Sequence, residues 1–271
     1  MEIKFLNISL KNKNKYVIKN LNLSIKHSLI TGVYQDNLKI IPNLLTQNIN
    51  YLKGNILIDN VSFYAYEDNL ISYIDNNFNF LTRSVSDEFF LASHKINNPK
   101  NEEYLNKIIS SLKLFDLSEI FLERNINTLS KSEKKLVKIL TNLIIDPDIL
   151  IFDEPFLYFD KDNREKFKKV ILELKRKYNK TIIILSDDIN VLYEISDELI
   201  VFKENQVLIA DKVKNIFKNL VFLENNSIPL PNLILFNKIA LNYKQKLTSH
   251  KDVKDLIKEV YRNVTEFKKE V

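Results

Sequence analysis

Hydrophobic and polar positions alternate over short stretches in the first 75 residues. A period of two residues is typical of β-strands that bury one face. This pattern predicts strands at 2–10, 17–25, 28–34, 54–59 and 71–74, separated by Asn, Lys and Asp. We therefore expect the first part of the chain to be rich in β-structure.

The apolar residues of the next part recur at helical spacing. Residues 102–113 and 131–145 each place leucines and isoleucines on one face, which predicts two amphipathic helices. Ser130 and Glu133 form a capping-box pattern at the start of the second helix, and Pro147 ends it. The region between the β-rich part and Pro147 is thus expected to be mainly helical.

Fully apolar strands then alternate with helices. Residues 149–152 and 181–185 form two such strands, and shorter strands are expected near 198–202 and 206–210. The charged helix between the first two turns four apolar residues inward, namely Phe167, Val170, Ile171 and Leu174. Continuous apolar strands joined by helices indicate a parallel sheet that is covered on both faces.

The pattern changes after residue 212. Pro229 and Pro231 mark a linker, and two short helices are expected near 231–243 and 249–262. The last helix is predicted to bury five apolar residues: Val253, Leu256, Ile257, Val260 and Tyr261. These helices indicate a small C-terminal unit that is distinct from the α/β part.

Composition excludes several kinds of site. The 271 residues contain no cysteine, and the three histidines match no ligand spacing. A disulfide framework, a thiolate metal site and a thiol nucleophile are therefore excluded. The chain has only two glycines, Gly32 and Gly54. An intact phosphate loop is also excluded, because such loops need several glycines within about ten residues.

The net charge of +5 is spread along the chain. Solubility accounts for such an excess, and attraction to an anionic membrane face or to nucleic acid is the alternative. No apolar run approaches the roughly 20 residues that a membrane span needs, and the N-terminus does not resemble a signal peptide. We expect a cytoplasmic protein, or one on the cytoplasmic face of the membrane, with no nucleic-acid partner.

Two adjacent carboxylates follow the apolar strand at 149–152. Asp153 and Glu154 stand at the carboxyl end of that strand, where α/β sheets place their ligands. The first could hold Mg²⁺, and the second could orient or polarise a water molecule. Taken alone, the pair is also compatible with an ordinary solvated loop.

Six further segments accompany this pair along the chain: GNILID at 54–59, LSKSEKK at 129–135, FLYFD at 156–160, SDD at 186–188, ISDELIV at 195–201 and QVLIAD at 206–211. Their order and spacing resemble the nucleotide-binding subunit of an ABC transporter. In that resemblance Asp153 and Glu154 form the Walker B motif. Residues 129–135 then correspond to the signature, 156–160 to the D-loop, and 186–188 to the loop that carries the switch histidine.

The resemblance implies a fold and a domain organisation. The fold is an ABC-type α/β nucleotide-binding domain at 1–218, related to P-loop NTPases, with an N-terminal antiparallel β subdomain and a helical subdomain at about 76–145. Residues 222–231 and the helix that begins after 247–249 are similar to the tail of A subunits of energy-coupling factor (ECF) importers. A small C-terminal helical domain at 219–271, similar to a dimerisation domain, is thereby implied.

Partners follow from the same resemblance. In the ECF group two A subunits pair and drive a transmembrane T subunit, which works with an exchangeable substrate-binding S subunit for vitamins or metal ions. The resemblance thus implies a second ABC ATPase subunit, T-type and S-type membrane subunits, and a peripheral position on the cytoplasmic face of the cell membrane.

The phosphate loop departs most from this family. Where the family has a sequence similar to GpNGsGKST, this chain has Gln35, Asp36, Asn37, Leu38, Lys39, Ile40, Ile41, Pro42 and Asn43. The three glycine positions carry Gln35, Leu38 and Ile40, whose side chains obstruct the approach of a phosphate to the backbone. Ile41 replaces the lysine that contacts the β- and γ-phosphates.

Other residues of this loop change its chemistry as well. Lys39 comes two positions before the lysine of the family and is expected on a different face of the loop. Pro42 removes a backbone donor. Because proline is tolerated in the first turn of a helix, Pro42 could still open one there.

Three further positions differ from the family. Asp187 replaces the switch histidine, and its charge would repel a γ-phosphate by up to about 4 kcal/mol at about 4 Å. Asn76 stands at the Q-loop position and is one methylene shorter than glutamine, which limits its reach to a metal. Asn12 stands where an adenine-stacking aromatic residue is expected, and Tyr16 is a possible substitute.

The signature is altered but retained in part. It consists of Ser130, Lys131, Ser132 and Glu133, and in the family it contacts the nucleotide of the partner chain. The positive charge of Lys131 and the start of a helix both favour binding of an anion. Capping of the helix alone would also explain Ser130 and Glu133. Asp160 of the D-loop also persists, together with the Walker B pair. These carboxylates either hold the D-loop and the sheet edge together or reflect recent divergence.

The favoured interpretation is a degenerate A subunit of an ECF-type importer. ATP and Mg²⁺ would bind at the partner's site, and this chain would bind them weakly or not at all, which leaves Glu154 idle. Two alternatives remain. The chain could be an active ABC ATPase that uses Glu154, or an ABC-like regulatory or binding module without a membrane partner.

Overall fold

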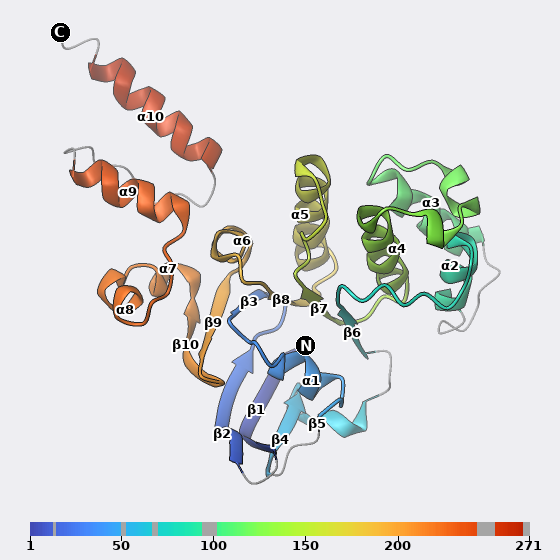
Figure 1. Cartoon of the computed structure of the whole chain (residues 1–271), viewed down its shortest axis with the longest axis horizontal. Helices are drawn as coiled ribbons and strands as arrows, with labels where there is room; N and C mark the ends of the chain where they lie inside the picture. Colours follow the sequence, from blue (N-terminus) through green and yellow to red (C-terminus); the bar gives the residue numbers. More distant parts are fainter. Residues whose placement is uncertain (13–14, 50–52, 67–69, 94–101, 243–252, 268–271) are drawn as a thin grey trace.

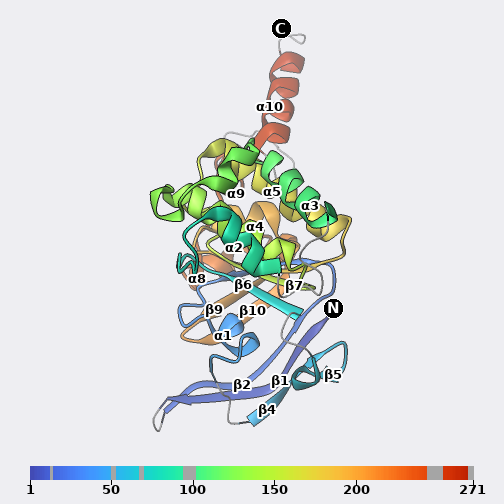
Figure 2. The same cartoon turned by 90° about the vertical axis from the view of Figure 1, so that its right-hand side faces the viewer.

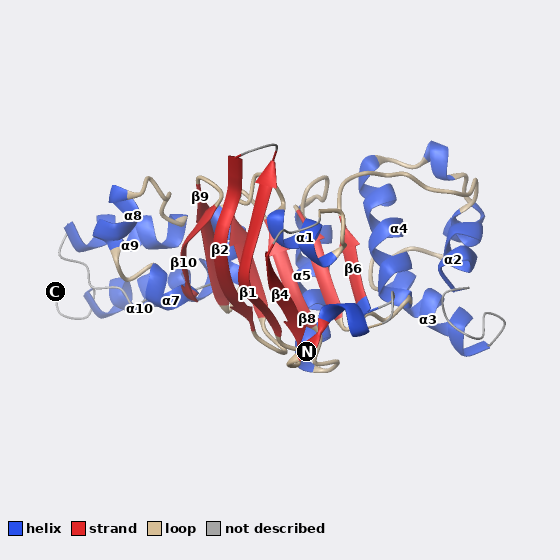
Figure 3. Cartoon of the chain, turned by 90° about the horizontal axis from the view of Figure 1, so that it is seen from below, coloured by secondary structure: helices blue, strands red, loops and turns tan. Residues whose placement is uncertain are grey.

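Two β-sheets lie at the centre of the molecule, and helices lie at both ends (Figures 1 and 3). The computed structural model describes residues 1–12, 15–49, 53–66, 70–93, 102–242 and 253–267. The larger sheet has the strand order β10-β9-β3-β8-β7-β6. Its strands are β3 (Ile30–Tyr34), β6 (Ile71–Ile74), β7 (Ile149–Asp153), β8 (Thr181–Leu185), β9 (Glu198–Lys203) and β10 (Gln206–Lys212). All pairs are parallel except β9 with β10.

The smaller sheet is antiparallel and has the order β2-β1-β4-β5. Its strands are β1 (Ile3–Asn12), β2 (Lys15–Ile25), β4 (Lys53–Ile58) and β5 (Val61–Ser62). Gly54 in β4 has a φ of 105°, and a Cβ atom there would lie 2.5 Å from the carbonyl oxygen of Leu6. Because glycine alone combines that backbone angle with the missing Cβ, this residue allows β1 and β4 to pair closely.

The helices form two groups beside the sheets (Figures 1 and 3), and Figure 2 shows most of them on the side away from the smaller sheet. On one side lie α2 (Val85–Ser93), α3 (Glu102–Lys113) and α4 (Lys131–Ile144), with the 3₁₀ turns η3 (Glu119–Glu123) and η4 (Ile126–Thr128). On the other side lie α7 (Val213–Ile216), α8 (Leu220–Asn225), α9 (Asn232–Asn242) and α10 (Val253–Phe267). The remaining elements are α1 (Ile40–Leu45), η1 (Phe63–Ala65), α5 (Lys161–Arg176) and α6 (Ile189–Ile195).

Alternate residues of β7 supply two cores on the two faces of the larger sheet. Leu150 and Phe152 belong to the core that α4 and α5 cover, whereas Ile149 and Ile151 belong to the core that includes α1 and the smaller sheet. All five residues of β7 and of β8 are buried. This is the arrangement expected of continuous apolar strands that are covered on both faces.

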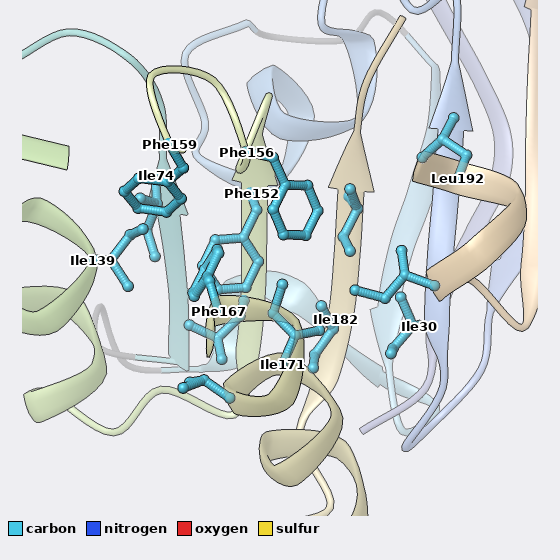
Figure 4. Close-up of a cluster of buried hydrophobic side chains, with 14 of the residues drawn as sticks. Ile30, Ile74, Ile139, Phe152, Phe156, Phe159, Phe167, Ile171, Ile182 and Leu192 are labelled. Atoms are coloured by element: carbon cyan, nitrogen blue, oxygen red, sulfur yellow. The ribbon is translucent and has the colours of Figure 1, made fainter. Parts of the chain in front are cut away.

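An aromatic cluster forms the centre of the first core. Figure 4 shows Phe167 of α5 against Phe152 of β7, with Phe156 and Phe159 close by. The ring centroids of Phe152 and Phe167 are 5.4 Å apart at an interplanar angle of 81°, and those of Phe159 and Phe167 are 5.8 Å apart at 79°. Edge-to-face packing of this kind stabilises aromatic clusters beyond the area that they bury.

Most of the predicted elements are confirmed, including the parallel sheet, the helix that starts at Ser130 and the two C-terminal helices. The prediction that α10 buries Ile257 and Tyr261 is wrong, because their exposed fractions are 49% and 71%. Leu256 is buried as predicted, and Val260 is partly buried. The side chain of Val253 and residues 249–252 lie outside the described part. No helix in the described ranges has the length and apolarity needed to cross a membrane.

Candidate functional site

The carboxyl ends of three neighbouring parallel strands, β3, β8 and β7, meet around a polar hollow. Its volume is about 170 Å³, and we call it the central hollow. Parallel sheets commonly place ligands at such an edge. The lining residues are Val33, Gln35, Asp36, Asn37, Lys39, Asp153, Glu154, Leu185, Ser186 and Asp187.

Asp36 closes the start of α1 from within the loop. Its carboxylate accepts hydrogen bonds from the backbone N–H groups of Ile40 at 2.8 Å and Ile41 at 3.1 Å. The side chain is buried, and this burial raises the pKa of Asp36. Helix starts leave backbone donors without partners inside the helix, and here a carboxylate of the same chain satisfies two of them.

Lys39 enters the central hollow, so the prediction that it lies on a different face of the loop is wrong. Its ammonium forms an ion pair with the Asp153 carboxylate. The Lys39 backbone N–H donates to the carbonyl of Asp36 at 2.9 Å, and Lys39 has a left-handed backbone with a φ of 49°. This tight turn, together with the length of the lysine side chain, explains how a residue two positions early reaches β7.

Asp153 is almost completely buried and is held on several sides. In addition to Lys39, the hydroxyl of Tyr73 donates to its Oδ2 atom at 2.9 Å. Burial, followed by the nearby Asp153 carboxylate, raises the pKa of Tyr73. The side-chain amide of Asn76 donates to the backbone carbonyl of Asp153 at 3.0 Å. Tyr73 was not among the predicted site residues; it lies on β6, which pairs with β7.

Glu154 is also engaged within the chain. One carboxylate oxygen accepts from the backbone N–H of Asp187 at 2.6 Å, and the other accepts from the hydroxyl of Ser186 at 2.9 Å. Burial raises the pKa of Glu154. Asp187 therefore supplies a backbone donor to Glu154, while its own side chain is exposed.

A lysine beneath the Walker B position was not anticipated. Lys135 of α4 is fully buried, and its ammonium donates to the side-chain oxygen of Asn76 at 2.6 Å. It also donates to the backbone carbonyls of Asp153 and Glu154, both at 3.3 Å. Burial lowers the pKa of Lys135 to about 8.

The amino-acid sequence is similar to those of known ABC transporter proteins. The family model described as ABC transporter matches residues 40–157. The energy-coupling factor transporter ATP-binding protein EcfA of Malacoplasma penetrans is 30% identical over 207 residues, 76% of this chain and 66% of that protein. EcfA of onion yellows phytoplasma is 27% identical over 258 residues, 90% of this chain and 92% of that protein. The chain belongs to the ABC transporter ATP-binding family.

A solved structure supports the same fold. The structure of cbiO1 from Clostridium perfringens, part of the ABC transporter complex cbiONQ, matches with a TM-score of 0.71 at 20% identity. The match covers 87% of this chain and 98% of that one. The ABC-type fold and the similarity to ECF ATP-binding proteins are therefore confirmed. Members of the ABC family generally bind ATP with Mg²⁺.

Residues 35–43, which the sequence resemblance places at the phosphate loop, divide into two parts. Gln35, Asn37 and Lys39 line the central hollow, whereas Ile40, Ile41 and Pro42 are buried in α1. Leu38 is exposed, and Asn43 donates from its side-chain amide to the carbonyl of Leu38 at 3.0 Å. Pro42 is the third residue of α1, which confirms that the helix tolerates it in the first turn.

The signature residues stand apart from the central hollow, at the start of α4. Ser130 and Glu133 form the predicted capping box: the Ser130 N–H donates to Glu133 at 2.8 Å, and the Glu133 N–H donates to the Ser130 hydroxyl at 3.2 Å. Arg124 pairs with the Glu133 carboxylate. Ser132 follows in the first turn, partly buried.

The D-loop lies close to the signature. The ammonium of Lys131 stands 5.1 Å from the ring centroid of Tyr158, a cation–π contact. Asp160 caps α5 by accepting from the Asn163 N–H at 2.8 Å. Tyr16, the possible adenine-stacking residue, is half exposed, and the ammonium of Lys11 stands 4.5 Å from its ring centroid.

Proposed function

We propose that this chain is the degenerate ATP-binding subunit of an ECF-type importer and works beside a second, competent ABC ATPase. An asymmetry between two parts of the chain supports this function. The central hollow lacks the glycines and the lysine of a phosphate loop, whereas α4 keeps a capped start with Ser130 and Lys131 exposed. The chain would thus use its signature on another subunit's nucleotide.

The residues of the central hollow do not fit ATP with Mg²⁺. The two N–H groups at the start of α1 already donate to Asp36, and the carboxylate of Asp153 already pairs with Lys39. A phosphate would have to displace Asp36, which would leave a buried carboxylate without its donors, at a cost of several kcal/mol. We infer that the chain binds nucleotide weakly or not at all at this site.

Charge acts in the same direction. Four carboxylates and one ammonium line the central hollow, and the acidic residues are Asp36, Asp153, Glu154 and Asp187. Two like charges about 4 Å apart repel by about 4 kcal/mol at an effective dielectric constant near 20. A triphosphate entering this hollow would meet several such repulsions, and only Lys39 would offset them.

The start of α4 has the opposite character. A helix N-terminus favours anions, and Lys131 adds a positive charge to it. Glu133 contributes a negative charge, but Arg124 pairs with it. We propose that Ser130 and Lys131, with Ser132 and Glu133 behind them, contact the ATP that the partner ATPase holds. Asp160 of the D-loop would lie at the same interface.

A hollow between α2 and α4 is suited to a membrane partner. Its volume is about 430 Å³, and its apolar lining residues include Leu81, Leu91 and Ile145. Leu81 is 82% exposed, and Phe90 and Leu91 of α2 are also exposed. Contiguous apolar patches on a soluble surface commonly mark interaction sites. We propose that the T-type subunit docks here, which would hold the chain on the cytoplasmic face of the membrane.

The C-terminal helices offer a second apolar surface. Exposed apolar residues on α9 and α10 are Leu235, Phe236, Ile239, Ile257 and Tyr261. We propose that residues 219–271 use this surface to pair with the second ABC ATPase. An S-type subunit in the same complex would choose the substrate, a vitamin, metal ion or similar small nutrient.

Co-purification from the native cells tests the assembly. The tagged chain should bring down a second ABC ATPase and a membrane protein. Leu81→Asp combined with Leu91→Asp should lose the membrane protein and keep the ATPase. Ile120→Asp, at a residue that is 72% exposed and does not line the hollow, is the matched control and should keep both. If the wild-type chain captures neither, the importer function is wrong and a regulatory module is favoured.

ATP turnover by the assembled complex tests the asymmetry of the two sites. Ser130→Ala should slow turnover markedly, since loss of one donor to developing charge costs about 10²–10³ in rate, and remaining backbone donors soften this. Glu154→Gln should leave turnover nearly unchanged. Substitution of the catalytic glutamate of the second ATPase should abolish it. If Glu154→Gln slows turnover as much as Ser130→Ala, this chain has an active site of its own.

A further inference from the structure

Lys135 joins three parts of the chain that are far apart in sequence. It belongs to α4, which packs against β6, and its ammonium binds Asn76, just beyond β6, and the two carbonyls at the end of β7. The side chain is fully buried. These contacts join the signature helix directly to the edge of the sheet that carries Asp153 and Glu154.

The acceptors that Lys135 contacts are amide oxygens, which carry no full charge. A buried ammonium loses its hydration, and neutral acceptors restore only part of that loss. An apolar residue would avoid this cost, but it would also remove the donor that the Asn76 side chain and the two carbonyls at the end of β7 share. Burial of Lys135 is costly, yet its ammonium has three hydrogen-bond acceptors. This combination indicates that the lysine holds α4 in position.

A second lysine strengthens the same attachment. Lys138 lies one helical turn after Lys135 and therefore faces the same side of α4. It pairs with Asp75 and donates to the carbonyl of Asn77 at 2.5 Å. Lys138 is partly exposed, and its acceptors lie only in the segment after β6, so Lys135 alone of the two reaches the end of β7.

Lys135 is also close to the functional end of its helix. Ser130 precedes it by five residues, which is about 7.5 Å along the axis at about 1.5 Å per residue. A helix is stiff over this length, so a contact that fixes Lys135 also fixes where Ser130 is presented. Small displacements of a group in a reacting site reduce rates strongly, by about 10² for 1 Å.

We propose that Lys135 is a positioning residue: it fixes α4 to the end of β7 so that Ser130 meets the nucleotide of the partner ATPase. This inference rests on the proposed function, because it concerns the use of the signature on another subunit. Lys135 itself touches no nucleotide. Its effect on the reaction passes through the orientation of α4.

Steady-state turnover by the complete complex gives the first test. Lys135→Met should lower kcat by about tenfold or more and change KM for ATP far less, because the misplaced Ser130 acts mainly in the transition state. Lys169→Met, at an exposed lysine of α5 that lies outside the signature, is the control and should leave both constants unchanged. An unchanged kcat in a folded Lys135→Met complex would overturn the proposal.

The orientation of α4 is measured directly in the second test, on the full chain alone. The chain has no cysteine, so spin labels can be placed at Asn142→Cys on α4 and Arg164→Cys on α5 without removing native thiols. Asn142 is partly exposed and Arg164 is exposed. Lys135→Met should broaden or shift the distance distribution between the labels, and Lys134→Met should not. A distribution identical to that of the wild type overturns the proposal.

The two tests separate this inference from the proposed function. If no complex assembles from wild-type subunits, the proposed function fails, and the spin-label distance still decides whether Lys135 orients α4. If Lys135→Met does not fold, Lys135→Gln takes its place, because it keeps an N–H donor without the charge. Partial recovery of kcat and of the wild-type distance in Lys135→Gln, relative to an apolar variant, supports positioning by hydrogen bonds.

Discussion

The buried ammonium of Lys135 predicts an unusual dependence of stability on pH. Burial lowers its pKa from the ordinary value of 10.5 to about 8 in the folded chain. One unit of pKa corresponds to about 1.4 kcal/mol, so the folded state disfavours the charged form by roughly 3 kcal/mol. The appropriate perturbation is Lys135→Met, which removes the charge and keeps an unbranched side chain of similar length.

The direction follows from proton linkage. Below about pH 8 the lysine is protonated in both the folded and the unfolded chain, and the full cost of the buried charge is present. As the pH rises from about 8 towards 10.5, the folded chain releases its proton first and that cost disappears. The wild type should therefore gain up to roughly 3 kcal/mol of stability relative to Lys135→Met across this interval.

Urea unfolding followed by circular dichroism measures this difference. Wild type, Lys135→Met and Lys134→Met are compared at several pH values between about 7 and 10. The difference in the free energy of unfolding between two of these chains cancels the contributions of the other lysines and tyrosines that titrate. The free energy of unfolding of Lys134→Met should follow that of the wild type throughout. A constant difference between wild type and Lys135→Met over the whole interval would refute the reasoning that the ammonium is buried.

Two other predictions concern packing. Phe167→Ala should lower the free energy of unfolding by about 3–5 kcal/mol in urea titrations, because Phe152, Phe156 and Phe159 all pack against this ring; a loss below about 1 kcal/mol would contradict the central position of the ring. Gly54→Ala should cost about 1–3 kcal/mol, because the new Cβ would meet the Leu6 carbonyl at a φ of 105°; an unchanged melting temperature would show that β1 and β4 pair differently.

Much of the fold followed from hydrophobic periodicity. The apolar runs that became β7 and β8 and the capping box at Ser130 were predictable, because burial and local hydrogen bonding both act within a short segment. Helix α2 was not predicted, since Phe89, Phe90 and Leu91 are consecutive and show no helical period. In the structure Phe89 is buried, whereas its two neighbours are exposed. β5, with two residues, is too short to leave a pattern.

The site was less predictable than the fold. Alignment of residues 35–43 with a glycine-rich phosphate loop identifies the family residues that are absent. It does not predict the new contacts that form in their place. The pairing of Lys39 with Asp153 depends on a left-handed backbone at Lys39, which a single sequence does not reveal. Asp36 carried a detectable signal, since an aspartate shortly before a helix is a common cap. A lysine is normally assigned to the surface, which is why the buried Lys135 was missed.

The last C-terminal prediction failed for a related reason. Periodicity places Leu256, Ile257 and Tyr261 on neighbouring parts of one helix, and it was interpreted as a buried face. The structure buries only the first of these three within the chain. An apolar stripe identifies a face that can be covered, but it does not distinguish cover by the same chain from cover by a partner.

The number of nucleotides bound by the assembled complex tests the central claim most directly. Equilibrium binding of ATP with Mg²⁺ should be measured on a complex in which the second ATPase carries a substitution of its catalytic glutamate, so that bound ATP persists. Because Asp36 and Lys39 occupy the donors and the carboxylate of this chain's site, we expect one ATP per pair of ABC subunits. Two ATP molecules per pair, with the second lost on Lys39→Met, would contradict the account.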